Sequence, residues 1–173
     1  DYSNSLTGVK VDLQSGSGSQ GYAAGDTYSS IENIIGSNIN HITGADKTTE
    51  RDWIYGNAAS NHIRGLGGND ILEGGGGADL IDGGAGWDYA RYIRSSEGVH
   101  IDLQTGVHTG GDAQGDTLVS IEAVVGSKYN DSLFGGDGND YLSGGFGDDI
   151  VSGSGGVDDL FGNEDADIFW FNT

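Results

Sequence analysis

Aspartates recur every nine residues in two stretches of the chain, and each aspartate closes a glycine-rich run. Between Gly65 and Arg91 the sequence reads GLGGNDILE, GGGGADLID and GGAGWDYAR. Between Gly126 and Trp170 it reads GSKYNDSLF, GGDGNDYLS, GGFGDDIVS, GSGGVDDLF and GNEDADIFW. Carboxylate and backbone carbonyl oxygens in flexible loops, without histidine or cysteine, are hard ligands that favour Ca²⁺ over Zn²⁺ or copper. Magnesium fits less well, because it requires a stricter octahedron with retained waters. The spacing therefore predicts a series of calcium sites.

The nine-residue unit follows the template G-G-x-G-x-D-x-U-x, in which U is a large apolar residue. Glycines at positions 1, 2 and 4 permit positive φ and let carbonyl groups turn inward without interference from a Cβ atom. The last three residues form a short strand in which U faces one side and its neighbours the other. The U residues are Ile54, Ile63, Leu72, Ile81 and Ala90 in the first array, and Leu133, Leu142, Val151, Leu160 and Phe169 in the second.

Two nonapeptides make one coil with two strands and two turns, and such coils stack at about 4.8 Å along the hydrogen-bonding direction. This predicts an all-β fold of two parallel β-rolls in tandem, with 18 residues per coil and a thin core. Turns of repeats i and i+2 stack on the same side, which brings their carboxylates together. Two like charges 4 Å apart repel by about 4 kcal/mol at an effective dielectric near 20. Metal binding is therefore expected to be coupled to folding.

The sequence also contains a second, longer repeat that includes the nonapeptide arrays. VKVDLQSG at Val9–Gly16 returns as VHIDLQTG at Val99–Gly106, and GDTYSSIENIIGS at residues 25–37 returns as GDTLVSIEAVVGS at residues 115–127. Both offsets are 90 residues. The chain is therefore a tandem duplication, in which each copy has a strand-rich lead-in followed by a nonapeptide array.

This duplication predicts four regions. They are a strand-rich lead-in over residues 1–35, a first β-roll with a degenerate start over 36–91, a strand-rich connector over 92–125 and a second β-roll over 126–173. The runs IENIIG and IEAVVG are expected to form the first strand of each roll and to cover its open end. Asp12 and Asp102 lie next to turns of the lead-ins. For these two side chains, contact with water is favoured over metal binding.

The amino-acid composition excludes some classes of protein and some classes of binding partner. The 173 residues include 27 Asp and Glu against 7 Lys and Arg, for a formal net charge of −20. Such a surface repels phosphate backbones, which disfavours nucleic acid as a partner. No apolar run approaches the roughly 18 residues of a membrane span. The absence of cysteine fits a secreted protein held together without disulfides. Because the chain does not begin with Met, we expect a segment of a larger or processed protein.

The residues give little support to a glycosidase site, a zinc site or a phosphate-binding loop. Close pairs of aspartates are unavoidable in so acidic a chain, and ligand or solvated-turn roles explain them without a glycosidase-type pair. The 4 histidines show no HExxH or comparable zinc spacing. No G-x-x-x-x-G-K-[ST] phosphate loop occurs. Most tryptophans and tyrosines are expected to cover the ends or flanks of a thin roll, with sugar stacking as the less favoured role. The sequence therefore predicts that this segment is not an enzyme.

The blocks GGDGNDYLS, GGFGDDIVS and GGGGADLID resemble the RTX nonapeptide, the hemolysin-type calcium-binding repeat of bacterial type I secreted proteins. The resemblance implies a parallel β-roll with several Ca²⁺ ions between stacked turns, in a protein that is exported unfolded and folds outside. It carries the ligand role to position 6, which is Asp70, Asp79, Asp88, Asp131, Asp140, Asp149, Asp158 and Asp167, with Asp52 and Asn61 in the degenerate start. Backbone carbonyls at positions 1 and 3 would complete the shells: Gly65, Gly67, Gly74, Gly76, Gly83, Ala85, Gly126, Lys128, Gly135, Asp137, Gly144, Phe146, Gly153 and Gly155.

Four departures from the family pattern weaken the sites near them. Asn61 is neutral, Asp52 follows an enlarged loop over residues 44–51, Leu66 replaces a turn glycine, and residues 162–165 read GNED. In the second array, the aspartates at position 6 follow one another without interruption.

The resemblance implies a calcium-binding module that folds after type I secretion and stabilises or presents a larger bacterial protein, such as a toxin, an adhesin or an enzyme. Its location would be extracellular or the bacterial surface, and its partners would be calcium ions and, through the parent protein, the type I secretion apparatus. The alternative is an accessory polysaccharide-binding module of an extracellular enzyme such as an alginate epimerase. That role needs exposed cations or aromatics along one face of a roll, for which the candidate cations are Arg91, Arg94 and Lys128.

Overall fold

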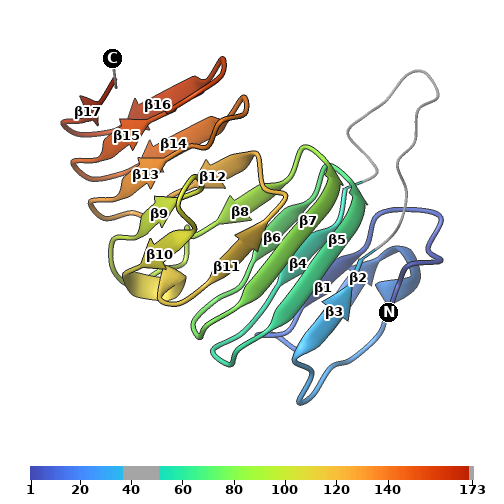
Figure 1. The fold of residues 1–173 in the computed structure, drawn as a ribbon. Helices are drawn as coiled ribbons and strands as arrows, with labels where there is room; N and C mark the ends of the chain where they lie inside the picture. The colour runs from blue at the N-terminus through green and yellow to red at the C-terminus, as the bar shows by residue number, and fades with distance from the viewer. Residues whose placement is uncertain (37–50, 172–173) are drawn as a thin grey trace.

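The computed structural model describes residues 1–36 and 51–171, so most of the enlarged loop before Asp52 lies outside the described residues. The described part is almost entirely β, with two short 3-10 turns, η1 (Gly21–Ala23) and η2 (Gly111–Ala113). The coils stack from the N-terminal lead-in to the C-terminal end along one axis (Figure 1). Within the described residues, no helix has the length and apolarity to cross a membrane.

One sheet extends through the whole stack. In spatial order its eight strands are β16 (Asp159–Asn163), β14 (Tyr141–Gly145), β12 (Ala123–Val125), β8 (Tyr89–Arg91), β6 (Ile71–Glu73), β4 (Trp53–Tyr55), β1 (Lys10–Asp12) and β2 (Ser17–Gln20). All neighbours pair in parallel except β1 and β2, which form an antiparallel pair. The two arrays therefore share a continuous sheet.

The facing side of the stack is divided between two sheets. The first holds β11 (Thr117–Val119), β7 (Leu80–Gly86), β5 (His62–Gly68) and β3 (Asn33–Ile35). The second holds β10 (Val107–Thr109), β9 (His100–Asp102), β13 (Ser132–Phe134), β15 (Ile150–Ser152) and β17 (Ile168–Phe169). The break falls within the connector, where β9 and β10 form an antiparallel hairpin.

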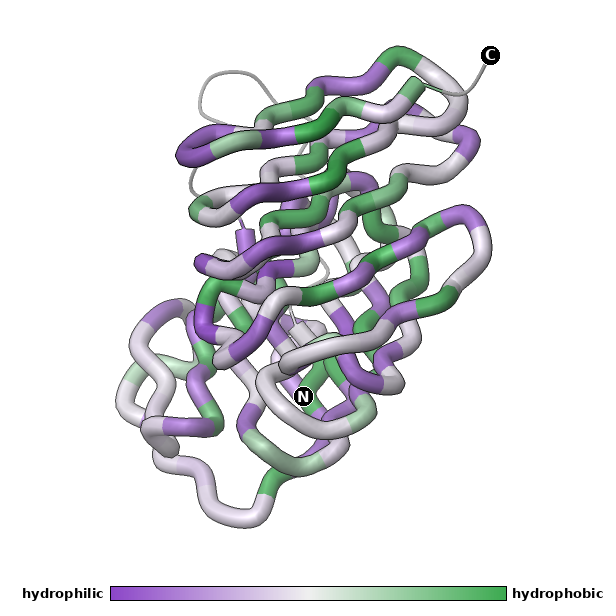
Figure 2. The backbone as a smooth tube through the Cα atoms, turned by 90° about the vertical axis from the view of Figure 1, so that its left-hand side faces the viewer, coloured by the Kyte–Doolittle hydropathy of each residue, from purple (hydrophilic) through white to green (hydrophobic). Residues whose placement is uncertain are grey.

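The strand register confirms the parallel β-roll and its 18-residue coil. Ile63 pairs with Ile81, and Leu133 pairs with Val151, in the facing sheets. In the continuous sheet, one ladder of U-type residues passes through both arrays, and its members are Val11, Ile54, Leu72, Ala90, Val124, Leu142 and Leu160. Hydrophobic and hydrophilic segments alternate along each coil, as expected when every second strand residue points inward (Figure 2).

The core consists of the facing U ladders. Eight of the ten U residues are buried, while Leu160 is half-buried and Phe169 is 42% exposed in the last coil. Most of the buried apolar residues form two clusters, one in each copy of the duplication, except that Ala90 at the end of the first array belongs to the second cluster. Leu118 and Ile121 of the connector pack against both clusters. The connector therefore joins the two cores rather than merely linking them in sequence.

The two apolar runs of the lead-ins take different places. IENIIG supplies β3, which is the terminal strand of its sheet, in register with β5. The expectation that IEAVVG also covers an open end is wrong, because its strand β12 pairs with β8 on one side and β14 on the other. The reason is that β8 ends the first array with an unpaired edge, and the connector satisfies those backbone groups by adding a strand there.

Candidate metal sites

The position-6 residues of the first array lie above one another in two columns, one on each side of the roll. On one side, the N–H of Asp52 donates to Oδ1 of Asp70 over 2.8 Å, and the N–H of Asp70 donates to Oδ1 of Asp88 over 2.8 Å. On the other side, the N–H of Asn61 donates to Oδ1 of Asp79 over 2.8 Å. Each carboxylate therefore binds the backbone of the turn one coil before it.

The second array repeats this arrangement. The N–H of Asp131 donates to Oδ1 of Asp149 over 2.8 Å, and the N–H of Asp149 donates to Oδ1 of Asp167 over 3.1 Å. The opposite column joins the N–H of Asp140 to Oδ1 of Asp158 over 3.0 Å. The stacked turns therefore bring together the aspartates that the i, i+2 spacing assigned to one side.

Two carboxylates that the repeat template did not find continue the columns of the first array. The N–H of Asp79 donates to Oδ1 of Asp116, and the N–H of Asp88 donates to Oε2 of Glu122, both over 2.9 Å. Both acceptors belong to the connector and occupy the place of the next position-6 aspartate. The signal that could have found them is the recurrence of GDT-x-x-SIE at residues 25–32 and 115–122, which keeps both acidic residues.

The second oxygen of several aspartates has no partner among the described residues. Oδ2 of Asp70, Asp79, Asp88 and Asp149 is buried and accepts no hydrogen bond. A buried carboxylate oxygen without a donor is costly, so the site requires either a proton or a cation there. Elsewhere the turn itself supplies a donor: Oδ2 of Asp131 accepts from the N–H of Ser127 over 2.6 Å.

The turn glycines serve two different purposes. A Cβ atom on Gly65, at position 1, would collide with Oδ2 of Asp70, and the same holds in the other repeats. Glycine is therefore required at position 1 because the neighbouring carboxylate leaves no room for a side chain. In several repeats, positions 2 and 4 adopt positive φ, as at Gly75 (φ 86°) and Gly77 (φ 119°). Leu66 holds a position-2 place at φ 78°, where an L side chain is strained.

Burial makes the charged form of these carboxylates unfavourable. Burial, followed by the charges of Asp52 and Asp88, raises the pKa of Asp70 to about 8. Burial also raises the pKa of Asp79 and Asp149 to about 6 and that of Asp116 to about 7. Hydrogen bonds from backbone N–H groups oppose these shifts without cancelling them. The ionised carboxylates of the columns therefore need a bound positive charge to be stable in the folded chain.

The donor set fits a hard divalent cation. Among the described residues, no three His, Cys, Asp or Glu side chains gather in one place, so carboxylates alone do not form a cage. Each buried, unpartnered Oδ2 atom lies next to a glycine turn. It therefore offers one carboxylate oxygen with backbone carbonyl oxygens near it. Six to eight oxygens in flexible geometry suit Ca²⁺.

A family model described as the RTX calcium-binding nonapeptide repeat matches the chain in 4 copies, over residues 48–81, 65–90, 121–151 and 134–169. Together these matches cover more than half of the chain. The chain belongs to the RTX calcium-binding nonapeptide repeat family. RTX nonapeptide repeats bind several Ca²⁺ ions per repeat block. A search of curated proteins finds no match.

The lead-in aspartates have turn-capping roles in the RTX roll. Oδ1 of Asp12 accepts from the N–H of Ser15, and Oδ1 of Asp102 accepts from the N–H of Thr105, both over 2.8 Å. The same bond in both copies shows that these carboxylates close the turn that follows β1 and β9.

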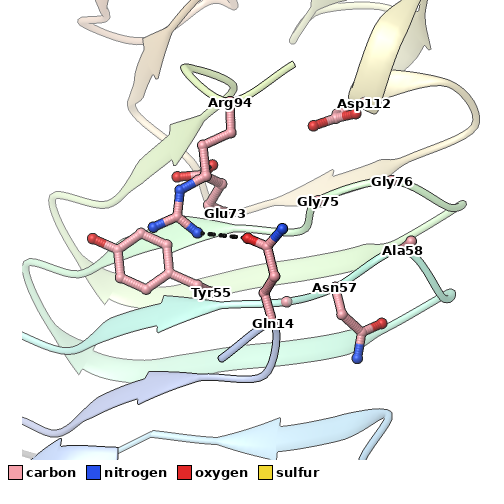
Figure 3. A pocket seen from close by; sticks show the side chains of 10 residues that line it. Gln14, Tyr55, Asn57, Ala58, Glu73, Gly75, Gly76, Arg94 and Asp112 are labelled. Carbon is pink, nitrogen blue, oxygen red and sulfur yellow. Dashed lines mark hydrogen bonds and ion pairs between the residues drawn. The ribbon is translucent and has the colours of Figure 1, made fainter. Parts of the chain in front are cut away.

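A pocket of about 260 Å³ lies where the two lead-ins meet the first array, and one of the candidate cations lines it. The Arg94 guanidinium stacks 4.4 Å from the Tyr55 ring centroid, and its Nε lies 3.5 Å from Oε1 of the buried Glu73 (Figure 3). Nη1 of Arg94 also donates to Oε1 of Gln14 over 3.3 Å. These contacts link the connector to the first lead-in, so Arg94 is engaged within the chain.

Proposed function

We propose that this RTX chain is a calcium-triggered folding module of a secreted bacterial protein, which it stabilises or presents once outside the cell. Repeats of this family are typical of secreted bacterial proteins. The observation that carries the proposal is the stacking of the aspartates in columns, with buried, unpartnered Oδ2 atoms at Asp70, Asp79, Asp88 and Asp149. We assign the calcium ligands to these carboxylates and to the carbonyls at positions 1 and 3 of the turns.

The columns explain why folding follows calcium. Without a cation, each coil added to the roll buries a further carboxylate next to another of like charge, and the thin U ladders are the main opposing force. Extracellular modules bind Ca²⁺ with dissociation constants of about 10⁻⁴ to 10⁻³ M. Low cytosolic calcium then keeps the chain extended for export, and external calcium drives folding.

The test compares Asp70→Asn with Asp159→Asn. The asparagine at position 70 still accepts the N–H of Asp52 but brings no charge, so it should stabilise the roll in EDTA and weaken calcium binding. Asp159 is exposed on a strand, so its variant is the control and should do neither. Circular dichroism in EDTA and in millimolar Ca²⁺, together with calorimetric titration, measures both effects. An unaltered calcium titration of Asp70→Asn would contradict the ligand assignment.

The alternative role in polysaccharide binding has one supporting observation. Tyr89, Tyr141 and Phe161 form a row on the continuous sheet, with ring centroids 5.9 and 5.0 Å apart. Such a row can stack on sugar rings. Binding to a glycan array that is lost in Phe161→Ala and kept in Val157→Ala would support this role, since Val157 is an apolar side chain outside the row that is more exposed than Phe161, at 81% against 42%. Absence of glycan binding in calcium would leave the folding module alone.

A further inference from the structure

The continuous sheet passes from the first array to the second at Glu122, a residue of the connector. Glu122 precedes β12, as Asp88 precedes β8 and Asp140 precedes β14, and these three strands pair in register. The N–H of Ala123 donates to the carbonyl of Asp88 over 3.0 Å, and the N–H of Tyr141 donates to the carbonyl of Glu122 over 2.9 Å. One column of acidic residues therefore runs through both arrays, and its members are Asp52, Asp70, Asp88, Glu122, Asp140 and Asp158.

The side chain of Glu122 makes the hydrogen bond of a position-6 carboxylate. Its Oε2 accepts the N–H of Asp88 over 2.9 Å, just as Oδ1 of Asp88 accepts the N–H of Asp70 over 2.8 Å. Neither Asp88 nor Glu122 takes part in the ion pairs found among the described residues, which are Arg64 with Asp82 and Arg94 with Glu73. Two carboxylates therefore lie close together, and no ion pair with Lys or Arg of the described chain neutralises either of them.

Asp88 has an oxygen left for a ligand at this junction. The residue is 0% exposed, and its Oδ2 accepts no hydrogen bond from the described residues. A Cβ atom placed on Gly83 would collide both with this Oδ2 and with the carbonyl oxygen of Ser120. The two oxygens therefore flank the same small space, and one of them comes from the first array and the other from the connector.

The carbonyl of Ser120 occupies the place that a position-1 carbonyl has in the other turns. A Cβ atom on Gly65 would collide with Oδ2 of Asp70 and would touch the carbonyl oxygen of Gly83, which is position 1 of the turn one coil later. After Gly83 the next coil belongs to the connector, and Ser120 supplies this oxygen instead. Ser120 adopts φ 51°, a left-handed conformation that is costly for serine and persists only where the surrounding structure holds it. The same pairing of a carboxylate oxygen with a position-1 carbonyl recurs at Gly36, Gly126 and Gly135.

We propose that Asp88, Ser120 and Glu122 form a further calcium site at the junction of the first array with the connector. Oδ2 of Asp88 and the carbonyl oxygen of Ser120 are ligands, and the carboxylate of Glu122 supplies the second negative charge. Carboxylate and carbonyl oxygens in irregular turns are the donors that Ca²⁺ takes in proteins. The inference rests on the proposed calcium function of the columns, and it extends that function to two residues that lie outside every nonapeptide.

A cation at this junction would join the two copies of the duplication. Leu118 and Ile121, which lie in the same segment as Ser120 and Glu122, pack against both hydrophobic clusters. A cation bound between Asp88 and Glu122 therefore holds this shared segment to the last turn of the first array. The column of metal sites then continues from one array into the other, although the nonapeptides themselves are interrupted.

Calorimetric titration with Ca²⁺ tests this site on three variants of the chain. In Glu122→Gln the amide oxygen still accepts the N–H of Asp88 but carries no charge, so this variant should bind about one ion fewer than the wild-type chain. Its β signal in EDTA should be larger, because one of two neighbouring like charges is gone. Glu122→Asp keeps the charge and matches the residue at this place in the other coils of the column, so it should bind the wild-type number of ions. Glu97→Gln removes the same charge from an exposed residue of the connector and should also bind that number.

The outcomes separate this site from the proposed function. A wild-type ion count and calcium midpoint in Glu122→Gln overturn the junction site and leave the calcium function of the columns standing. A wild-type chain that neither binds calcium nor folds in it overturns both. If circular dichroism shows that Glu122→Gln does not fold at any calcium concentration, Glu122→Asp decides, since a wild-type ion count in that variant supports the site and a loss of ions overturns it. The double variant Asp88→Asn with Glu122→Gln should bind no fewer ions than Asp88→Asn alone, and a further loss would place Glu122 at a different site.

Discussion

The backbone N–H of Asp131 donates a 2.8 Å hydrogen bond to Oδ1 of Asp149, which lies 18 residues later in the chain. Asp149 in turn donates its own N–H to Asp167, and its Oδ2 is buried without a partner. Asp149 therefore stands between two turns, with one carboxylate oxygen committed to the fold and one left for a cation.

Asp149→Ala should weaken calcium sites on both sides of its turn, whereas Asp167→Ala should affect only the site beneath the last turn. The calcium midpoint for folding should rise more for Asp149→Ala, and calorimetric titration should show the larger loss of bound ions. Leu142→Ala is the control for a purely apolar loss, because it should lower stability by about 2–5 kcal/mol without removing a site. Equal stoichiometry and midpoint for the two aspartate variants would contradict the shared-turn geometry.

Acid should replace calcium in part. Because the pKa of Asp70 is raised to about 8 and that of Asp79 to about 6, the folded chain without metal binds protons more tightly than the unfolded chain does. Stability of the metal-free roll is therefore greatest below the unfolded pKa of about 4 and is lost as pH rises toward about 8. Circular dichroism in EDTA should show more β signal at pH 5 than at pH 8. The calcium midpoint should rise on acidification, since protons compete for the same oxygens. A flat pH profile in EDTA would argue against buried carboxylates.

Asp116→Ala should destabilise the first array although it lies outside every nonapeptide. The change leaves the N–H of Asp79 and the hydroxyl of the buried Tyr92 without acceptors, at a cost of about 1–3 kcal/mol. Asp26→Ala is the matched control, because among the described residues Asp26 accepts a hydrogen bond from the hydroxyl of Tyr2 but none from a backbone N–H of an array. Urea unfolding in calcium measures both. Equal losses would mean that Asp116 acts only on its local turn.

Leu66→Gly should stabilise the roll by about 1 kcal/mol. Leu66 adopts φ 78°, and glycine removes the steric cost of a left-handed L residue while restoring the repeat template. Leu80→Gly is the control, since Leu80 lies in the strand β7, where glycine only adds backbone freedom and loses side-chain packing. Thermal unfolding in calcium should move in opposite directions for the two variants. A loss of stability in Leu66→Gly would show that the leucine side chain contributes more than its backbone costs.

The sequence by itself determined the coil. A nine-residue period with aspartate after the turn and an apolar residue in each strand permits only one stacking period, because two strands and two turns are needed to return to the same face. The pairs Leu72 with Ala90 and Asp131 with Asp149 follow directly from that period. The choice of Ca²⁺ follows from the ligand chemistry of carboxylate and carbonyl oxygens.

Only the tertiary structure decided how the two arrays meet. The pairing of β12 with β8 merges them into one continuous sheet, and Asp116 and Glu122 take the places of absent repeats. The nonapeptide template does not predict the roles of Asp116 and Glu122, because the connector has no nine-residue period and its contacts join positions that are distant in the sequence. The physical reason is that an unpaired strand edge and an unaccepted backbone N–H must be satisfied by whatever segment lies nearest in space, and sequence spacing does not record that proximity.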